Sequence, residues 1–473
     1  MSPKYQSPKK DRPTLPASNL EREFGKPSSE WTDDDLIGFV REHGIRLVSL
    51  MHIGGDGWLK TLDFVPRDYV HLQNIITGGE RADGSSLFGN LGIRTGKSDI
   101  VLRPRVSSAF INPFSPVPTL CLLCGHFGID REALPESPDT MVRKAYKRAY
   151  DETGAKLQAL GEVEYFLGRQ RDESDIYGVD DRGYHATSPF VFGEEVRRKA
   201  MVALAEMGVP LKYSHSEVGY VEASEDDATI WEQHEIELAL LPLPEAAEAV
   251  SLTMWVLRNL ARQAGMRCSF NPILKAGHAG SGMHFHMSPV VNGEHLGGFN
   301  GDGELYDYGK WLIAGLSRIG GALMAFGNTE ANSFVRLTQG KEAPNKVTWG
   351  RYNRRALIRL PMLALNAEGK PVSPPTIEFR LPDGSAHPHL LLAGIAQAFV
   401  AGKSMDDVDD FLKRSAVENA STGNDVGKVP HNQTQVGEEV KKHSDALTAG
   451  GIFPEHVIEK IIKSFEALSA HAS

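Results

Sequence analysis

The sequence has little cysteine, no long apolar run and no excess of positive charge. Three cysteines among 473 residues exclude a disulfide-rich scaffold and indicate a reducing compartment. No stretch approaches the ~20 apolar residues that span a bilayer, and the N-terminus lacks the apolar core of a secretory signal. With 51 basic against 61 acidic side chains, the net charge is -10, which argues against a nucleic-acid partner. We therefore expect a cytoplasmic globular protein that binds neither nucleic acid nor a membrane.

Composition and periodicity divide the chain into three parts. Residues 1–30 are rich in Pro, Lys and Ser and predict a disordered tail. Residues 31–127 predict a small β-rich domain, with a helix at 32–44, a hairpin at 45–66 and a strand at 119–127. Residues 128–473 predict a larger domain whose helices lie at 140–154, 194–208, 245–265 and 389–402. The predicted class is α+β, with an antiparallel sheet or part-barrel flanked by helices.

Cys121 and Cys124 form a CxxC pair within the apolar run TLCLLCGHF. A buried strand is the favoured interpretation over a redox or metal pair, because the chain contains no second CxxC to complete a zinc site.

Three predicted strands alternate ionisable with apolar residues, at 161–169, 281–289 and 375–383. Successive strand side chains point to opposite faces, so each strand gathers its ionisable groups on one side. On the first strand these groups are Glu162 and Glu164, on the second they are His284, His286 and Ser288, and on the third they are Glu378 and Arg380. Carboxylates with one imidazole on one side of one sheet favour a Mg²⁺ or Mn²⁺ site over zinc. Two further acids, Glu217 and Glu235, would complete two adjacent metal sites.

Basic groups accompany these acids. NRRALIRLP supplies Arg354, Arg355 and Arg359, and RLTQGKEAP supplies Arg336 and Lys341 beside Glu342. Arginines next to bound divalent metals neutralise charge in phosphoryl transfer, although a surface ion pair is the better explanation for any single arginine. The sequence has no P-loop motif and no kinase-like Gly-rich loop. An ATP-using enzyme of another type is therefore expected.

Six motifs occur in one order along the chain: RADGSSLFG with KSDIVLRP, GEVEYFL, GSGMHFHMS, RLTQGKEAP, NRRALIRLP and TIEFRLPDGSAHPHL. Together they resemble the glutamine synthetase family over residues 30–405. The resemblance implies a β-grasp-like N-terminal domain and a C-terminal catalytic domain. It also implies a ligase that phosphorylates the γ-carboxylate of glutamate with ATP and displaces phosphate with ammonia.

The resemblance implies a role for each matching residue. One metal ion would be held by Glu164, Glu217 and Glu235, and another by Glu162, His284 and Glu378. Each active site would hold two or three Mg²⁺ or Mn²⁺ ions in total. His286, Ser288 and Arg359 would bind ATP, with Arg354 also on its phosphates. Arg336, Arg380, Gly280, Ser86 and Tyr184 would contact the substrates, Tyr184 near the ammonium site. Asp83 would deprotonate ammonium and Glu342 would close the site. The resemblance further implies stacked hexameric rings, in which Asp83 serves a neighbouring subunit.

Several positions depart from the family pattern. Ala279 replaces an asparagine that helps to bind glutamate, Ile273 replaces a lysine, and Lys212 replaces a glutamate on the ATP side. Lys341, His387, His389 and an acidic insertion at 221–231 are further differences. Three hypotheses remain open. The first is glutamine synthesis, and the second is a related ligase, such as a γ-glutamyl amide synthetase, that uses another amine or acid. The third is a catalytically inactive structural homologue. This hypothesis predicts that metal ligands have been lost, whereas all the candidate ligands are present.

Overall fold

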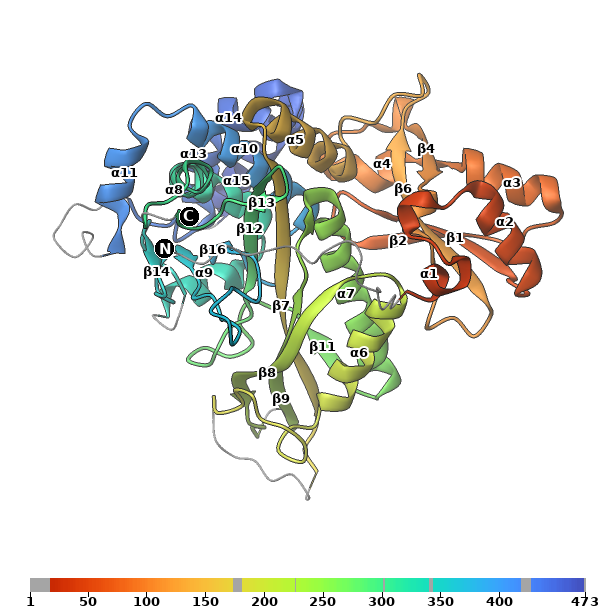
Figure 1. The fold of residues 1–473 in the computed structure, drawn as a ribbon, viewed down its shortest axis with the longest axis horizontal. Coiled ribbons are helices and arrows are strands. Elements are labelled where there is room, and N and C mark those ends of the chain that lie inside the picture. Colours follow the sequence, from red (N-terminus) through yellow and green to blue (C-terminus); the bar gives the residue numbers. More distant parts are fainter. Residues whose placement is uncertain are drawn as a thin grey trace.

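The computed structural model describes residues 18–172, 181–225, 227–300, 303–339, 343–417 and 427–471. Its strands form two sheets, and its helices pack mainly around the second one (Figure 1). In Figure 1 the first sheet lies on one side of the long strand β7 (Lys156–Gln170), and helices α8 and α11 lie on the other side. The predicted α+β class is confirmed. Among the described residues, no helix combines the length and apolar character that a membrane span requires.

The first sheet has the strand order β2-β1-β6-β4-β3, and β5 pairs with β6. The predicted hairpin is confirmed, since β1 and β2 pair antiparallel from Val48 opposite Phe64 to Ile53 opposite Leu59. The predicted strand at 119–127 is β6. The strands are β1 (Leu47–Ile53), β2 (Leu59–Phe64), β3 (Glu80–Asp83), β4 (Asp99–Pro104), β5 (Phe110–Ile111) and β6 (Thr119–Phe127).

Strand β6 is buried on both faces, which explains its continuous apolar run. Cys121 and Leu123 pack toward the large core of the second sheet. Leu120, Leu122 and Cys124 pack toward a smaller core beneath the N-terminal helices. Burial raises the pKa of both thiols to about 12, so the buried-strand interpretation of the CxxC pair is confirmed.

The N-terminal helices correct the predicted tail. Residues 18–30 are folded, with α1 (Asn19–Phe24) and a 3₁₀ turn at Ser28–Glu30. Leu20 is buried, and the Phe24 ring meets Trp31 edge-on at 5.3 Å. The polar composition of this segment concealed two apolar anchors, Leu20 and Phe24. Residues 1–17 lie outside the described residues. Helix α2 (Asp33–Glu42) begins at Thr32 with a capping box, as its sequence predicts.

The Gly-, Ser- and Asp-rich stretch 81–104 predicts a loop with a strand at its end. The strand is β4, but the loop contains the short helix α4 (Gly84–Phe88), which Asp83 caps. Helix α3 (Tyr69–Gly78) precedes this stretch. The domain boundary after residue 127 stays a prediction, although the last strand of the first sheet ends at that residue.

The second sheet has the strand order β14-β15-β16-β12-β7-β9-β8. Strands β10 and β11 pair with β7, and β13 pairs with β12. Besides β7, its strands are β8 (Leu211–Val221), β9 (Thr229–Leu238), β10 (Leu241–Pro242), β11 (Arg267–Ser269), β12 (Met283–Val291), β13 (Glu294–His295), β14 (Trp349–Arg351), β15 (Ile358–Leu360) and β16 (Ile377–Phe379).

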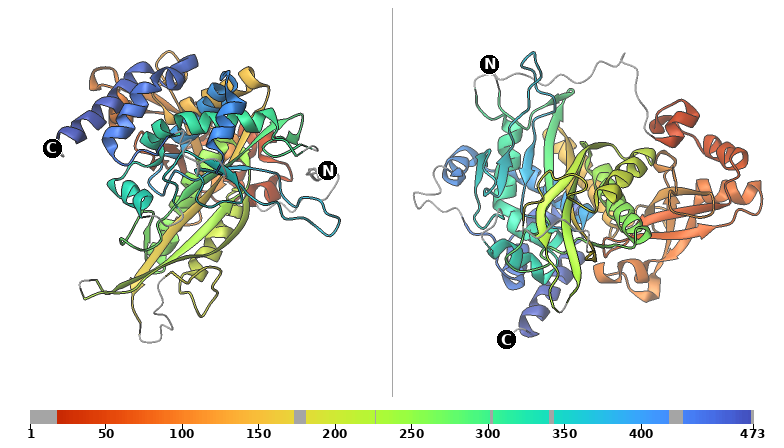
Figure 2. Two further views of the ribbon diagram at one scale, coloured as in Figure 1. Left: turned by 90° about the vertical axis from the view of Figure 1, so that its left-hand side faces the viewer. Right: turned by 90° about the horizontal axis from the view of Figure 1, so that it is seen from below.

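Helices cover this sheet, with α10 packed between α5 and α8, and with α7 against β7 (Figure 2). The four helices predicted in the second part are α5, α6, α7 and α10, whereas α8, α9, α11 and those that follow were not predicted. The helices are α5 (Pro138–Thr153), α6 (Glu194–Glu206), α7 (Leu243–Gln263), α8 (Asp307–Gly327), α9 (Ala331–Thr338), α10 (Pro388–Lys403), α11 (Val408–Ser415), α13 (Gln433–Lys442), α14 (Ser444–Thr448) and α15 (Glu455–His471).

Candidate active site

Strand register brings the predicted ionisable residues into one row across the second sheet. His284 of β12 lies opposite Glu162 of β7, and His286 lies opposite Glu378 of β16. On the other side of β7, Glu164 lies opposite Glu235 of β9. Directly opposed residues of an antiparallel pair project from the same face. The alternating patterns therefore predicted correctly that three separate segments share one side of one sheet.

This row forms the floor of a cavity of about 1310 Å³. Most of the predicted site residues line it: Glu162, Glu164, Tyr184, Glu217, Glu235, Gly280, His284, His286, Arg336, Arg354, Arg359, Glu378 and Arg380. A side chain at Gly280 would meet the carbonyl oxygen of Pro272 at 2.5 Å. The close approach of these two backbone segments therefore accounts for the glycine.

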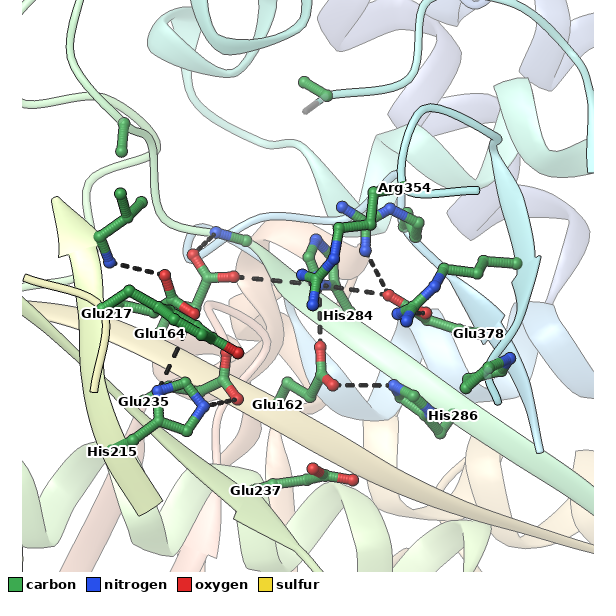
Figure 3. Close-up of a pocket in the computed structure, with 18 of the residues that line it drawn as sticks. Glu162, Glu164, His215, Glu217, Glu235, Glu237, His284, His286, Arg354 and Glu378 are labelled. Atoms are coloured by element: carbon green, nitrogen blue, oxygen red, sulfur yellow. Dashed lines mark hydrogen bonds and ion pairs between the residues drawn. The ribbon is translucent and has the colours of Figure 1, made fainter. Parts of the chain in front are cut away.

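One group of candidate ligands surrounds Glu162 (Figure 3). Its two carboxylate oxygens each lie 2.9 Å from an imidazole nitrogen, one of His284 and one of His286. Glu162, His284 and Glu378 form one set that could hold a metal ion. Burial, followed by the charge of Arg380, lowers the pKa of His284 to about 4. His284 is therefore a neutral imidazole at neutral pH, the form that binds metals.

A second group lies on the opposite side of β7. His215 Nε2 lies 3.3 Å from Glu235 Oε1, and His215 Nδ1 lies 3.9 Å from Glu217 Oε1. These three residues form a set with metal-ligand spacing. We expected Glu164 in this set, but its Oε2 accepts hydrogen bonds from the backbone N–H of Gly282 and the side chain of Gln233, at 2.7 and 2.9 Å.

Burial raises the pKa of all three carboxylates of this half, Glu164, Glu217 and Glu235. The charge of Glu217 adds to the effect on Glu164, and the charge of Glu162 adds to the effect on Glu235. Crowded, buried carboxylates favour a bound cation, since a cation neutralises their mutual repulsion. The donor set is mostly carboxylate with one imidazole, which fits Mg²⁺ or Mn²⁺.

Two residues of this region escaped the sequence analysis. His215 lies two positions before Glu217, and Glu237 lies two positions after Glu235, so the alternation that identified the other residues also includes them. Glu237 forms a third possible metal set with Glu162 and His286. Its Oε1 also lies 2.5 Å from Lys212 Nζ. Lys212, one of the departures from the family pattern, is thus paired with a buried acid of the cavity.

Arginines occupy the side of the cavity around Glu378. Arg359 Nη1 donates to Glu378 Oε2 at 2.6 Å, and Arg380 forms an ion pair with the other oxygen. Arg336 is buried, and its Nη1 donates to the carbonyl oxygen of Leu381 at 3.1 Å. Burial alone would raise the pKa of Glu378, but the charge of Arg380, with that of His286, outweighs it and lowers the pKa. This half of the cavity is therefore suited to an anionic group.

Three predicted site residues, Ser288, Asp83 and Ser86, lie in the described part of the chain but do not line the cavity, and a fourth lies outside that part. Ser288 is fully buried, and its hydroxyl donates to the carbonyl oxygen of Pro375 at 2.9 Å. Asp83 is exposed, and hydrogen bonds from Ser86 and Ser85 lower its pKa. Asp83 and Ser86 belong to the first sheet and its turn, away from the cavity lining. Glu342 lies outside the described residues, as does Lys341. The roles predicted for all four stay predictions.

The departures from the family pattern are distributed between the cavity and the core. Ile273 and Ala279 line the cavity. His387 and His389 are buried elsewhere, and their ring nitrogens have no hydrogen-bond partner. The acidic insertion forms the connection from β8 to β9, where Glu222 pairs with Arg171.

Comparisons with known proteins agree with these observations. A model of the glutamine synthetase catalytic domain matches residues 135–468. The glutamine synthetase of Clostridium saccharobutylicum is 30% identical over 379 residues, which are 79% of this chain and 80% of that protein. The glutamine synthetase of Frankia alni is 27% identical over 464 residues, covering 90% and 93% of the two chains.

Solved structures have the same fold at low identity. Plasmodium falciparum glutamine synthetase superposes with a TM-score of 0.76 at 20% identity, covering 93% of this chain and 96% of the other. A GmaS/ADP complex gives a TM-score of 0.73 at 20% identity, covering 92% and 96%. The catalytic-domain match spans more than half of the chain and includes the row of acids and imidazoles, so the chain belongs to the glutamine synthetase family of ATP-dependent ligases.

Proposed function

We propose that this protein joins the γ-carboxylate of glutamate to ammonia or a related amine, with ATP as the phosphoryl donor. The single observation that carries the proposal is the row of facing residues, which presents two acidic metal-ligand sets beside a group of arginines. The GmaS structure of the same fold contains ADP, which supports a nucleotide substrate here.

The residues of the cavity divide the chemistry between them. Glu162, His284 and Glu378 would hold one Mg²⁺ or Mn²⁺ ion, and His215, Glu217 and Glu235 would hold another. Bound metal would neutralise charge on the transferred phosphoryl group. Arg359 and Arg354 contact the phosphates, with His286 on the nucleotide side. Arg336 and Arg380 orient the carboxylate substrate and the phosphoryl group that it receives.

The reaction proceeds through an acyl phosphate, because a free carboxylate is a poor acyl donor. Phosphorylation gives the γ-carboxylate a leaving group, and the nitrogen nucleophile then displaces phosphate. Carboxylates near the nucleophile attract its cationic form and accept its proton. We assign this role to Asp83 of a neighbouring subunit, with Tyr184 beside the incoming nitrogen and Glu342 closing the site.

Phosphate release from Mg²⁺-ATP by purified protein tests the proposal. Release that requires both glutamate and a nitrogen donor, with the γ-glutamyl product identified by mass spectrometry, is the expected result. Release with glutamate absent but another carboxylic acid present would reject glutamate as the acid. No release with any acid–amine pair, from folded protein with bound Mn²⁺, would instead favour a catalytically inactive structural homologue.

A different acid is the second candidate, and the altered acid end of the cavity favours it. Ala279 lines the cavity and offers no side-chain amide where family members carry an asparagine. Losing one such contact costs on the order of 1–3 kcal/mol of recognition if the substrate's polar group stays unpaired. An Ala279→Asn variant that lowers the KM for glutamate, without changing kcat, would support glutamate as a weakly held substrate. An unchanged KM would favour another acid.

We also propose a ring-shaped homo-oligomer with sites shared between subunits. Asp83 is exposed and lies away from its own cavity, as a residue that serves a neighbour would. Mixing inactive Asp83→Asn subunits with inactive Glu378→Ala subunits should restore part of the activity after reassembly, because some sites then combine two intact halves. An inactive mixture of fully assembled rings would mean that each subunit uses its own Asp83.

A further inference from the structure

A second cavity, which we call the side cavity, adjoins the large one. Its volume is about 410 Å³, within the ~300–1,000 Å³ of typical small-molecule sites. Tyr184, Tyr213 and His215 line both cavities and therefore form a shared wall. The rest of the side cavity is formed by the loop before α6, the first turn of α6 and the edge strand β8. The candidate catalytic site thus has an adjoining chamber that the assigned substrates do not require.

The loop that forms one wall of the side cavity is fixed onto β8. The buried hydroxyl of Ser216 lies 2.8 Å from the carbonyl oxygen of Gly183 and 2.7 Å from that of Ala186. The backbone N–H of His185 donates to the carbonyl oxygen of Ser216 at 3.0 Å. His185 itself has a φ of 59°, which is uncommon for a residue other than glycine. Such a conformation persists where its surroundings enforce it, so the chamber is a built feature.

The shared wall is aromatic and borders a carboxylate. The Tyr184 ring stacks on His185 with centroids 4.3 Å apart, and the Tyr213 ring stacks on His215 at 5.9 Å. Tyr184 is 50% exposed and Tyr213 is 43% exposed, so ring surface faces the cavities. Aromatic faces attract ammonium groups. The carboxylate of Glu217 lies 3.9 Å from His215, which places negative charge on the main-cavity side of the same wall.

The formal charges inside the side cavity cancel. Glu194 and Arg197 are its carboxylate and its guanidinium, and they pair at 3.3 Å. Glu194 also lies 3.2 Å from Arg198. Each of these two charges therefore already has an opposite charge beside it. The chamber therefore suits an uncharged group, and the wall beside it suits an ammonium head.

We propose that the nitrogen substrate is a primary amine whose uncharged substituent occupies the side cavity, with its ammonium head at the Tyr184–Tyr213–His215 wall. This inference rests on the proposed function and specifies its nucleophile. The alkylammonium ion loses one proton to a carboxylate, and its nitrogen forms a bond to the acyl-phosphate carbonyl carbon. The carbon–oxygen bond to phosphate breaks, and phosphate leaves with that electron pair. The nitrogen loses a second proton as the secondary amide forms, so hydrogen phosphate and one proton accompany the product.

A panel of nitrogen donors tests the inference with the full-length protein, glutamate and Mg²⁺-ATP. The panel contains ammonium, methylamine, ethylamine, isopropylamine and the diamine putrescine. We expect kcat/KM to be at least tenfold higher for the best monoamine than for ammonium, and putrescine to be a poor substrate because its second charge has no partner. Each added methylene that fits an apolar pocket changes kcat/KM by ~10–200-fold, and the lower end applies to the side cavity because Thr187, Ser214 and Ser216 also line it.

Two variants fill the chamber from opposite sides, Ala186→Leu on the loop and Ser214→Leu on β8. Each should lower the ratio of kcat/KM for the best amine to that for ammonium by at least tenfold. Val202→Leu, on an exposed position of α6 outside the cavity lining, is the matched control and should leave the ratio unchanged. Ligand-observed NMR with isopropylamine, without ATP, provides a binding readout independent of turnover. The wild-type protein and the control should bind isopropylamine, and the filled variants should not.

The outcomes separate the inference from the proposed function. Glutamate-dependent release with ammonium as the preferred donor, and with a ratio unaffected by either filled variant, rejects the amine inference and leaves the ligase function intact. Absence of glutamate-dependent release with every donor rejects the proposed function and the inference with it.

Discussion

Replacing Glu378 tests the metal assignment and the packing around it together. Its side chain is fully buried and lies at the centre of the basic half of the cavity. Arg359 Nη1 donates to it at 2.6 Å, Arg380 pairs with its other oxygen, and His284 Nδ1 lies 3.7 Å away. A substitution therefore removes a candidate metal ligand and also leaves two arginines without their shared carboxylate.

The structure sets the expected magnitudes. Removing one partner of a buried ion pair costs about 3–5 kcal/mol, a large part of the ~5–15 kcal/mol stability of a typical protein. Glu378→Ala should therefore lower the free energy of unfolding by about 3–5 kcal/mol. Glu378→Gln keeps the volume and one acceptor oxygen, so it should cost about 1–3 kcal/mol. Even changes to the outer-shell partners of metal ligands reduce metal affinity or activity by ~10–100-fold, so both variants should lose at least ~100-fold in turnover.

Urea denaturation, phosphate release and light scattering measure stability, turnover and assembly separately. Glu368→Gln is the control, because Glu368 is an exposed carboxylate 3.3 Å from Lys370. It should match the wild type in all three measurements. A folded, assembled Glu378→Gln variant that keeps more than a tenth of wild-type turnover at saturating Mg²⁺ would refute the assignment of Glu378 as a metal ligand.

Three further predictions concern charges in the cavity and in the protein core. Mg²⁺ or Mn²⁺ should raise Tm in a concentration-dependent way, by linkage equivalent to about 2.7 kcal/mol at 100 times Kd. Binding of the metal ion should also release protons, because the crowded carboxylates have raised pKa values. Calorimetry in buffers of different ionisation enthalpy counts the released protons, and a count of zero would contradict the charge assignment. The Lys212→Ala variant should have a lower Tm, because it leaves Glu237 buried without its partner. The double variant Lys212→Ala/Glu237→Gln should recover at least half of that loss in Tm. A larger loss in the double variant would contradict the pairing. Burial lowers the pKa of four core histidines to about 3 or 4, so protons bind preferentially to the unfolded chain below its histidine pKa of about 6.5. The four are His52, His126, His387 and His389. Each should lower the free energy of unfolding by about 1.4 kcal/mol per pH unit as the pH falls from about 6.5 to 4, as measured by urea denaturation. The His389→Phe variant should show a smaller dependence of stability on pH, and a dependence equal to that of the wild type would contradict the assignment.

The parts of the site that the sequence predicts best are those governed by strand alternation. Glu162, His284 and Glu378 lie in three distant segments, yet period-two patterns and their flanking apolar residues were enough to place them on one face. The same pattern continues to His215 and Glu237, which shows that the rule was correct but applied too narrowly. Ser288 marks its limit. It follows the alternation, but the approach of Pro375 covers its hydroxyl, and tertiary contacts of this kind leave no periodic trace in a sequence.

Two elements were missed for different physical reasons. Helix α8 contains five glycines, and glycine is a poor helix former, so its sequence does not stand out as a helix. Helix α1 is short and polar, and Leu20 anchors it to a core that other segments supply. Local pattern cannot reveal a helix that depends mainly on distant partners. The cavity walls also depend on distant partners, because the side cavity is formed by a loop and an edge strand that meet only in the folded chain.

The arrangement of charge within the large cavity also discriminates between chemistries. Around Glu378, the charges of Arg380 and His286 outweigh burial and lower the pKa of the carboxylate. Around Glu235, carboxylates face one another and burial raises their pKa values. The first half favours an anionic group such as phosphate, and the second favours cations, both metal and ammonium. A phosphatase that uses water could use a metal ion in the second half, but it needs no site for a cationic nucleophile. A ligase needs both halves, because its leaving group is an anion and its nucleophile arrives as a cation. The separation of charge across β7 therefore favours carbon–nitrogen bond formation over simple hydrolysis of a phosphate ester.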